Sequence, residues 1–246
     1  MESHSTFYIL NFIFDSLRPR AGGGDIEYRS ICTLCLYASL LPFINSGCGF
    51  LPIFARITFL QTLLSHIKTL HPLSPDAQKA LEDCFEQLVF SKGDYLLTEG
   101  KICRHLYFLE RGALRGYYTL EGKEITHWFG FENDFVTSFH SFITQEPSVE
   151  NIQFLEGSIV WSISKEKLTK LFNEYHEIER LVRIAYEKYY IRLEERYVNA
   201  QFKTAAELYE NLLEQSPHIL ERVPLGYVAS YLGMSQETLS RIRSRL

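Results

Sequence analysis

Glycine and proline divide this chain into two regions that must fold differently. Seven of the fourteen glycines lie between residues 85 and 164. The stretch between Gly157 and Pro217, in contrast, contains neither glycine nor proline. Because these two residue types mark turns and interrupt helices, we expect short strands in the first region and long helices in the second.

The glycine-rich region contains six stretches that are rich in aromatic and β-branched residues and that partly alternate between apolar and polar, as half-buried antiparallel strands do. They are residues 86–90, 95–98, 105–110, 113–119, 124–129 and 153–164. Residues 91–94 and 120–123 have the composition of turns. Several short strands with regularly spaced turns predict a sandwich or small barrel of the jelly-roll type.

Length, composition and charge exclude several classes of protein. The 246 residues suit one large domain or two smaller ones, and 46% hydrophobic with 22% charged residues exclude wholesale disorder. The 25 basic and 30 acidic residues give a net charge of −5. This balance excludes a basic coat for nucleic acid but not a local DNA-reading element. Five cysteines are too few for a disulfide scaffold, and their odd number fits a reducing cytoplasm.

The N-terminal segment has a different composition from the rest of the chain. Residues 30–55 include no charged side chain, and this stretch is long enough to span a bilayer. However, Pro42, Gly47 and Pro52 interrupt this apolar stretch. A packed or re-entrant hairpin, a membrane anchor and an extension outside the working domains all stay open. We favour an extension covering residues 1–55 and do not expect a membrane partner.

Two groups of residues are candidate metal ligands. Cys32 and Cys35 form a C-x-x-C pair with Cys48 nearby, a spacing that can hold zinc or an iron–sulfur cluster. Their apolar surroundings and the distance to Cys84 favour buried, inert thiols instead. Three histidines fall in the predicted barrel without an H-x-H pair, namely His105, His127 and His140. A barrel metalloenzyme would rest on these histidines alone.

Sequence motifs of enzymes are also absent. The chain has no nucleophile elbow, phosphate-binding loop or dinucleotide-binding glycine motif. We therefore expect no enzymatic activity, no metal and no cofactor.

A long amphipathic helix is expected in the region without glycine and proline. Ser164 can cap a helix from Lys165, and a second helix is predicted from about residue 177 to 202. A helix of roughly 25 residues is about 38 Å long and extends beyond a small barrel. Packing against the barrel alone is the simpler interpretation, but a second copy of the helix would cover the remaining apolar stripe. The predicted dimerisation residues are Ile178, Val182, Ala185, Tyr186, Tyr189, Tyr190, Leu193 and Tyr197.

The C-terminal residues predict a helix-turn-helix. Thr204 and Glu207 form a capping box that opens one helix. Further on, Pro224 suits the first turn of a helix, Gly233 can end that helix in the left-handed conformation, and Ser235 can cap the next. The spacing of Pro224, Gly233 and Ser235 is consistent with a helix-turn-helix.

The second helix of this motif carries side chains that can read DNA. Arginine pairs with guanine, glutamate accepts from cytosine and glutamine pairs with adenine, while hydroxyls bind phosphate. Glu237 and Arg241 are four residues apart, so a solvated ion pair is the alternative interpretation. The predicted DNA-binding residues are Ser235, Gln236, Glu237, Thr238, Ser240, Arg241, Arg243 and Arg245.

The order of barrel, long helix and helix-turn-helix resembles the CRP/FNR family of transcription regulators over residues 57–246. The strongest matches are residues 235–241, similar to the family's recognition helix, and the pattern Phe90-x-x-Gly93-x-x-Leu96-x-x-x-Gly100. Residues 132–135 are similar to a short subgroup without a recognisable nucleotide site.

The resemblance implies an α+β protein with four parts. Residues 1–55 would be the extension, 56–174 a cyclic-nucleotide-binding-like jelly-roll barrel, 175–202 the dimerisation helix and 203–246 the DNA-binding domain. It also implies a cytoplasmic homodimer on a near-palindromic double-stranded DNA operator, with RNA polymerase as a further partner to consider. Glu237 and Arg241 match the family's base-contacting positions, whereas Gln236 stands where many members carry arginine.

Two departures from the family pattern matter. Members that bind cyclic AMP hold its phosphate with an arginine, and the aligned position here is Ser148. A desolvated phosphate needs a cationic or multi-donor partner, so we do not expect control by cyclic AMP. In addition, Leu246 follows Arg243 by three residues, so we expect phosphate contacts from Arg243, Arg245 or residues before Pro224 rather than from a β-wing.

An unknown small-molecule effector is still expected. Its candidate pocket residues are Phe129, Phe135, Thr137, Ser138 and Ser148, although aromatic residues at this density are typical of a core. The alternative function is a small-molecule-sensing or protein-interaction barrel with weak or no DNA binding.

Overall fold

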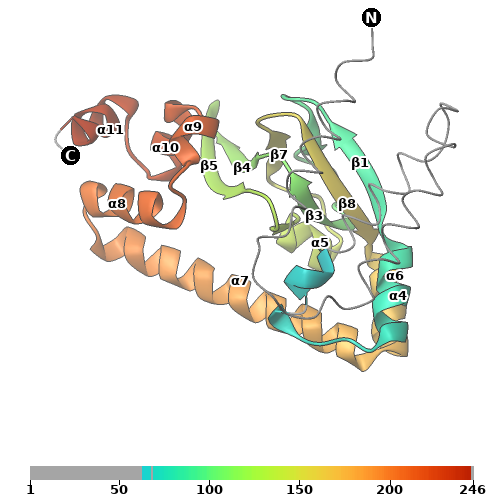
Figure 1. Ribbon diagram of the computed structural model, residues 1–246. Coiled ribbons are helices and arrows are strands. Elements are labelled where there is room, and N and C mark those ends of the chain that lie inside the picture. The colour runs from blue at the N-terminus through green and yellow to red at the C-terminus, as the bar shows by residue number, and fades with distance from the viewer. Residues whose placement is uncertain (1–62, 68, 245–246) are drawn as a thin grey trace, which may run out of the picture. The chain divides into compact units, whose positions relative to one another are not determined.

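The computed structural model describes residues 63–67 and 69–244 (Figure 1). The chain forms two compact units, Met1–Ile53 and Phe54–Leu246, and the described residues all belong to the second. The predicted extension over residues 1–55, with Cys32, Cys35 and Cys48, lies outside the described residues. So does Arg245.

The glycine-rich region folds as a sandwich of two antiparallel sheets. One sheet has the strand order β1-β8-β3-β6 and the other the order β2-β7-β4-β5. The strands are β1 (Glu86–Phe90), β2 (Tyr95–Leu97), β3 (His105–Arg111), β4 (Leu114–Leu120), β5 (Lys123–Gly130), β6 (Phe135–Val136), β7 (Asn151–Phe154) and β8 (Ser158–Ser164). The first five lie where the sequence predicts them, within one or two residues.

The structure differs from the predicted strands after β5. The stretch 153–164 is two strands rather than one, because a bend over residues 155–157 separates β7 from β8 and places them in different sheets. The short strand β6 and helix α5 (Phe139–Thr144) were not predicted. Both are shorter than the window over which a hydrophobic period can be recognised.

Helices flank the sandwich and complete its core. They are α4 (Pro75–Cys84), α6 (Lys165–Glu174) and α7 (His176–Phe202), and residues 63–67 and 69–70 are also helical. Ser74 caps α4 and Ser164 caps α6, each accepting a hydrogen bond from a backbone N–H of the first turn. Figure 1 shows α6 and α4 beside each other at the start of α7. The buried core joins strand residues such as Phe108 and Ile152 to Leu168, Leu171 and other apolar helix residues.

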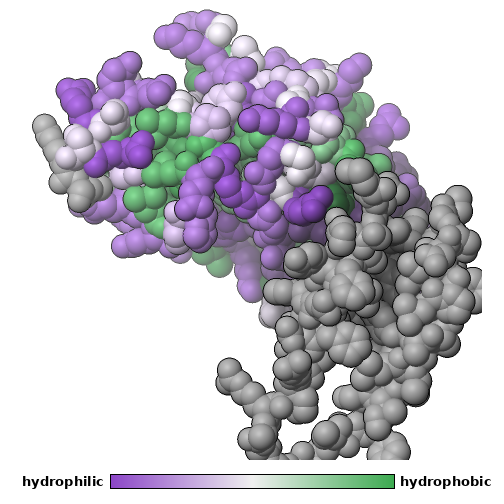
Figure 2. All heavy atoms as spheres, turned by 45° about the horizontal axis from the view of Figure 1, so that its top comes forward, coloured by the Kyte–Doolittle hydropathy of each residue, from purple (hydrophilic) through white to green (hydrophobic). Residues whose placement is uncertain are grey.

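The C-terminal part consists of four helices, α8 (Ala205–Gln215), α9 (Ile219–Arg222), α10 (Leu225–Tyr231) and α11 (Gln236–Arg243). The predicted capping box of Thr204 and Glu207 opens α8. A second apolar cluster joins these helices to Ala113 and Leu155 of the sandwich. Some members of this cluster are only partly buried, and Figure 2 shows hydrophobic side chains reaching the surface on the side of the C-terminal helices.

Candidate functional site

Helix α11 presents the polar side chains that the sequence marks for DNA binding. Ser235 caps the helix by accepting a hydrogen bond from the Thr238 N–H at 3.2 Å. Leu239 is fully buried and packs the inner face of the helix against the second apolar cluster. The predicted DNA-binding residues on the exposed face are Ser235, Gln236, Glu237, Ser240, Arg241 and Arg243, while Thr238 is half-buried.

The solvated ion pair between Glu237 and Arg241 is not formed within the described residues. Instead, Arg241 Nη2 donates to Thr238 Oγ1 at 3.3 Å. Hydrogen bonds from its own backbone N–H and from Ser235 lower the pKa of Glu237, with a smaller contribution from Arg241. Both charged groups thus make only local contacts within the exposed part of their own helix.

The preceding helix fixes the position of α11. Val228 and Ala229 of α10 are buried, and the Met234 N–H donates to the Ala229 carbonyl at 3.0 Å across the turn. Gly233 has a φ of 69°, the left-handed conformation expected for the residue that ends such a helix. Pro224 lies at the N-cap of α10, one position before the predicted first turn.

Helix α10 also docks on strand β5 of the sandwich. Ser230 Oγ accepts a hydrogen bond from the Thr126 N–H at 3.0 Å and donates to the Glu124 carbonyl at 3.2 Å. A side chain of α10 thus takes the place of a neighbouring strand at the edge of the sheet. This contact could not be predicted from the sequence, since serine at an exposed helix position is common.

Arg222 forms a second connection between the C-terminal helices and the sandwich. Its guanidinium contacts both Glu132 oxygens at 2.8 Å and also pairs with Glu156. Glu132 in turn accepts the Gly112 N–H at 2.9 Å. Burial alone would raise the pKa of Glu132, but the hydrogen bonds from Arg222 and Gly112 lower it below its usual value. This bidentate geometry specifies the orientation of α9 against the sandwich.

Arg115 of β4 is buried at the same interface. Its guanidinium lies between the rings of Tyr117, at 4.1 Å, and Tyr227 of α10, at 3.6 Å. Nη2 contacts Glu124 at 2.5 Å and Gln153 at 3.0 Å, whereas Nε and Nη1 have no hydrogen-bond partner among the described residues. Thr126 Oγ1 is likewise buried without one. The contact between sandwich and α10 is therefore extensive but incompletely satisfied.

Two of the predicted pocket residues are tied into an internal polar network. Ser138 Oγ lies 3.1 Å from Ser148 Oγ, which donates to the Glu150 carbonyl at 3.0 Å. The buried Glu150 carboxylate contacts His127 Nε2 at 2.6 Å and Trp128 Nε1 at 2.9 Å. Burial raises the pKa of Glu150, but hydrogen bonds from His127, Ser138 and Trp128 outweigh this and lower it. A buried carboxylate at this place disfavours a bound phosphate.

The other three predicted pocket residues lie elsewhere. Thr137 Oγ1 donates to the His105 carbonyl at 3.0 Å. Phe129 packs on the second cluster, with its ring 5.2 Å from that of Tyr231, and Phe135 packs on the first cluster. These three side chains nevertheless line a cavity of about 650 Å³ between the sandwich, α7, α8 and the turn after α10.

Helix α7 divides the predicted dimerisation residues into two groups. Ile178 is fully buried in the core of its own chain, and Val182 packs against that core. Tyr186 and Tyr189 pack on Phe139 of α5. Ile178 therefore contributes no free surface, because the first half of the helix covers the sandwich, whereas Tyr189 keeps 37% of its surface accessible.

The second half of α7 has an exposed apolar face. Of the predicted residues, Tyr190, Leu193 and Tyr197 are exposed, with 64%, 48% and 67% of their surface accessible. Ile191, Val198 and Phe202 are also exposed but were not predicted, because they follow a separate stripe on the helix. Ala185 is half-buried.

In the part of the chain that the structure describes, no group of three or more histidine, cysteine, aspartate or glutamate side chains is placed to hold a metal ion. His105 lies near Tyr107, His127 pairs with Glu150, and His140 is exposed. None of the helices in residues 63–67 and 69–244 is long and apolar enough to cross a membrane.

Comparison with known proteins identifies the sandwich. Residues 87–175 match the cyclic nucleotide-binding domain family. No curated protein matches the chain significantly.

Solved structures extend the similarity beyond the sandwich. FixK2 from Bradyrhizobium japonicum is 20% identical with a TM-score of 0.56, covering 66% of this chain and 84% of its own. CLP from Xanthomonas campestris, a c-di-GMP responsive global regulator, is 14% identical with a TM-score of 0.58, covering 70% and 91%. A protein of Eubacterium rectale assigned to the crp/fnr family is 18% identical with a TM-score of 0.55, covering 70% and 83%. The resemblance to CRP/FNR regulators is confirmed at the level of the fold.

Proposed function

We propose that this chain, whose sandwich matches the cyclic nucleotide-binding domain family, is a transcription regulator of the CRP/FNR type that binds a specific DNA sequence as a homodimer. The observation that carries the proposal is helix α11. Its apolar side is buried through Leu239, its start is capped by Ser235, and its outer face presents Gln236, Glu237 and Arg241 to solvent. These are the side-chain types that read base edges in the major groove.

The exposed half of α7 supports the homodimer. Tyr190, Leu193 and Tyr197 form one stripe at spacings of three and four residues, which suits a second helix of the same kind. A dimer places one α11 in each half-site of an inverted repeat, with centres about one helical turn apart. The dimer surface therefore consists of the second half of α7 rather than its whole length.

The network around Glu150 supports an effector other than cyclic AMP. Ser138 and Ser148 hydrogen-bond to each other, and the Glu150 carboxylate is buried beside them. A cyclic phosphate would be desolvated next to a negative charge, with serine hydroxyls in place of an arginine. We propose that the domain senses a different ligand, and that the protein acts in the cytoplasm.

Selection from a random duplex DNA pool tests DNA binding. We expect an inverted repeat, bound with an affinity that falls as salt rises because phosphate contacts release counterions. Arg241→Ala should weaken binding to the selected site by about 1–3 kcal/mol while leaving random DNA less affected. Arg180→Ala is the matched control, since it removes an exposed arginine of α7. Recovery of no sequence in the absence or presence of candidate ligands would favour the alternative of a sensing or interaction module.

Light scattering after gel filtration tests the dimer. We expect a dimer for the unmodified chain and a monomer for Tyr197→Glu, because a charge in the centre of an apolar helix pair is left desolvated. Leu120→Glu, at an equally exposed apolar residue of β4, should leave the dimer intact. A monomeric unmodified chain at micromolar concentration would contradict the proposed dimer.

A further inference from the structure

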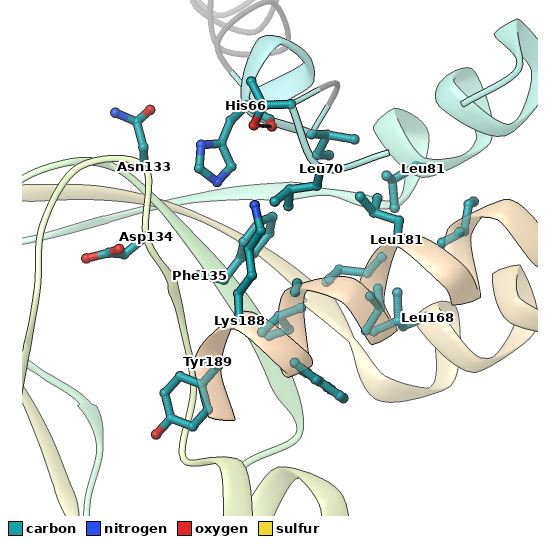
Figure 3. Close-up of a pocket in the computed structure, with 18 of the residues that line it drawn as sticks. His66, Leu70, Leu81, Asn133, Asp134, Phe135, Leu168, Leu181, Lys188 and Tyr189 are labelled. Carbon is teal, nitrogen blue, oxygen red and sulfur yellow. Dashed lines mark hydrogen bonds between the residues drawn. The ribbon is translucent and has the colours of Figure 1, made fainter. Parts of the chain in front are cut away.

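A second cavity lies between the first half of α7 and the sandwich. It has a volume of about 260 Å³ and is bounded by the helical residues 63–67 and 69–70, by α4 and α6, and by the first half of α7. Its floor is apolar and includes Leu70, Leu81, Leu168 and Leu181. Figure 3 shows these side chains to the right of His66, Asp134 and Lys188. Of the predicted pocket residues, Phe135 lines this cavity, whereas Phe129, Thr137, Ser138 and Ser148 do not.

The mouth of the cavity carries more positive than negative charge. Lys188, Arg192, His66 and Asp134 line it. Asp134 is already engaged, since Oδ2 accepts the Phe131 N–H at 3.0 Å and Oδ1 lies 3.8 Å from Arg192 Nη1. Lys188 takes part in no ion pair among the described residues. In Figure 3 the Lys188 ammonium extends toward His66, whereas the Asp134 carboxylate points away from both.

We propose that this cavity binds a medium-chain carboxylate, with the tail on the leucine floor and the carboxylate at Lys188 and His66. The apolar floor suits an alkyl tail, and the positively charged mouth suits a carboxylate head. Burial lowers the pKa of His66, an effect that Asp134 opposes and Lys188 reinforces, so the ring can donate one hydrogen bond as a neutral group.

The position of the cavity gives the ligand a structural consequence. Leu181, Val182, Ala185 and Lys188 line it from successive turns of α7. A ligand here contacts the buried side of the helix whose other half carries Tyr190, Leu193 and Tyr197. The inference deepens the proposed function by naming the ligand class of the sensing domain. Binding of the carboxylate can nevertheless be measured in the absence of DNA.

Calorimetric titration of the full chain with octanoate tests the inference. We expect one molecule per chain. Hexanoate, which lacks two methylenes, should bind about tenfold more weakly. Octan-1-ol and octylamine have the same tail with a neutral and a cationic head, and both should bind more weakly than octanoate.

Two variants and one control locate the site. Lys188→Gln should weaken octanoate about tenfold and leave octan-1-ol unchanged, because only the charged head loses its partner. Ala185→Leu should abolish binding by filling the cavity, and its melting temperature shows whether the fold is retained. Lys170→Gln, an exposed lysine of α6, should have no effect.

Several results would overturn the inference. They are tighter binding of octylamine than of octanoate, equal binding in Lys188→Gln, and many weak sites or none at all. The result of the octanoate titration is independent of the result of the DNA selection. A single octanoate site in a chain that selects no DNA would leave this inference standing, and a selected operator with no octanoate binding would leave the regulator standing.

Discussion

Gly116 of β4 offers the sharpest test of how the sandwich is packed. It pairs with Trp128 of β5, and a Cβ built at Gly116 would lie 2.0 Å from Trp128 Nε1 and 2.2 Å from Trp128 Cε2. The same Nε1 donates to the Glu150 carboxylate at 2.9 Å. Gly116→Ala therefore forces the indole away from both its packing position and its hydrogen-bond partner.

The expected cost follows from these two effects. Overpacking costs about 1–3 kcal/mol, and the lost hydrogen bond to a charged group about 1.5–3 kcal/mol. Because Trp128 is only partly buried and can turn toward solvent, we expect a total near the lower end, about 3 kcal/mol. For a domain of this size that lowers the melting temperature by about 6–12 °C.

Thermal and urea unfolding, followed by circular dichroism and tryptophan fluorescence, measure this cost. Gly157→Ala is the matched control, since its Cβ meets nothing within 4 Å and it should be neutral or slightly stabilising. In a Trp128→Ala background, Gly116→Ala should become nearly neutral, because the side chain it displaces is gone. Unchanged unfolding of Gly116→Ala, or an equal cost in both backgrounds, would refute the reasoning.

Three further predictions concern the C-terminal helices and the polar network. Arg222→Gln removes both ion pairs of a partly exposed side chain, so we expect the free energy of unfolding to fall by about 1 kcal/mol. Hydrogen exchange in α10, measured by mass spectrometry, should become faster. Unchanged exchange there would contradict the docking role of Arg222. The pKa of Glu150 is lowered in the folded state, so its contribution to stability is present above about pH 4.5 and is lost as the pH falls through the folded pKa. Urea midpoints measured across that range should fall less steeply in Glu150→Gln, and equal slopes would count against the network. Ser235→Ala removes the N-cap of α11 and should cost about 1 kcal/mol, visible as faster exchange at the start of that helix, whereas Ser244→Ala should not change it.

Local chemistry was sufficient to predict most of the secondary structure. Strands β1 to β5 follow turn residues and alternating apolar positions, and α6, α8 and α11 begin at hydroxyl caps that the sequence shows directly. Gly233 adopts the positive φ that its place after α10 predicts. These features depend on residues within three or four positions of each other, and for that reason a single sequence reveals them.

The exposed face of α11 could be predicted for the same reason, because one buried residue, Leu239, sets the helix phase. The division of α7 into a buried first half and an exposed second half could not be predicted. Ile178 and Tyr190 belong to similar apolar stripes, and only the position of the sandwich buries the first and leaves the second exposed.

Contacts between distant residues were decided by the tertiary structure alone. Arg222 meets Glu132, 90 positions away, and Ser230 meets Thr126, 104 positions away. The charged side chains are ordinary surface residues in the sequence, and neither serine nor threonine signals a partner. The network of Ser138, Ser148 and Glu150, and the charge at the mouth of the smaller cavity, arise in the same way. Sequence determines which local structures are favourable, whereas burial and pairing of polar groups depend on which surfaces the folded chain brings together.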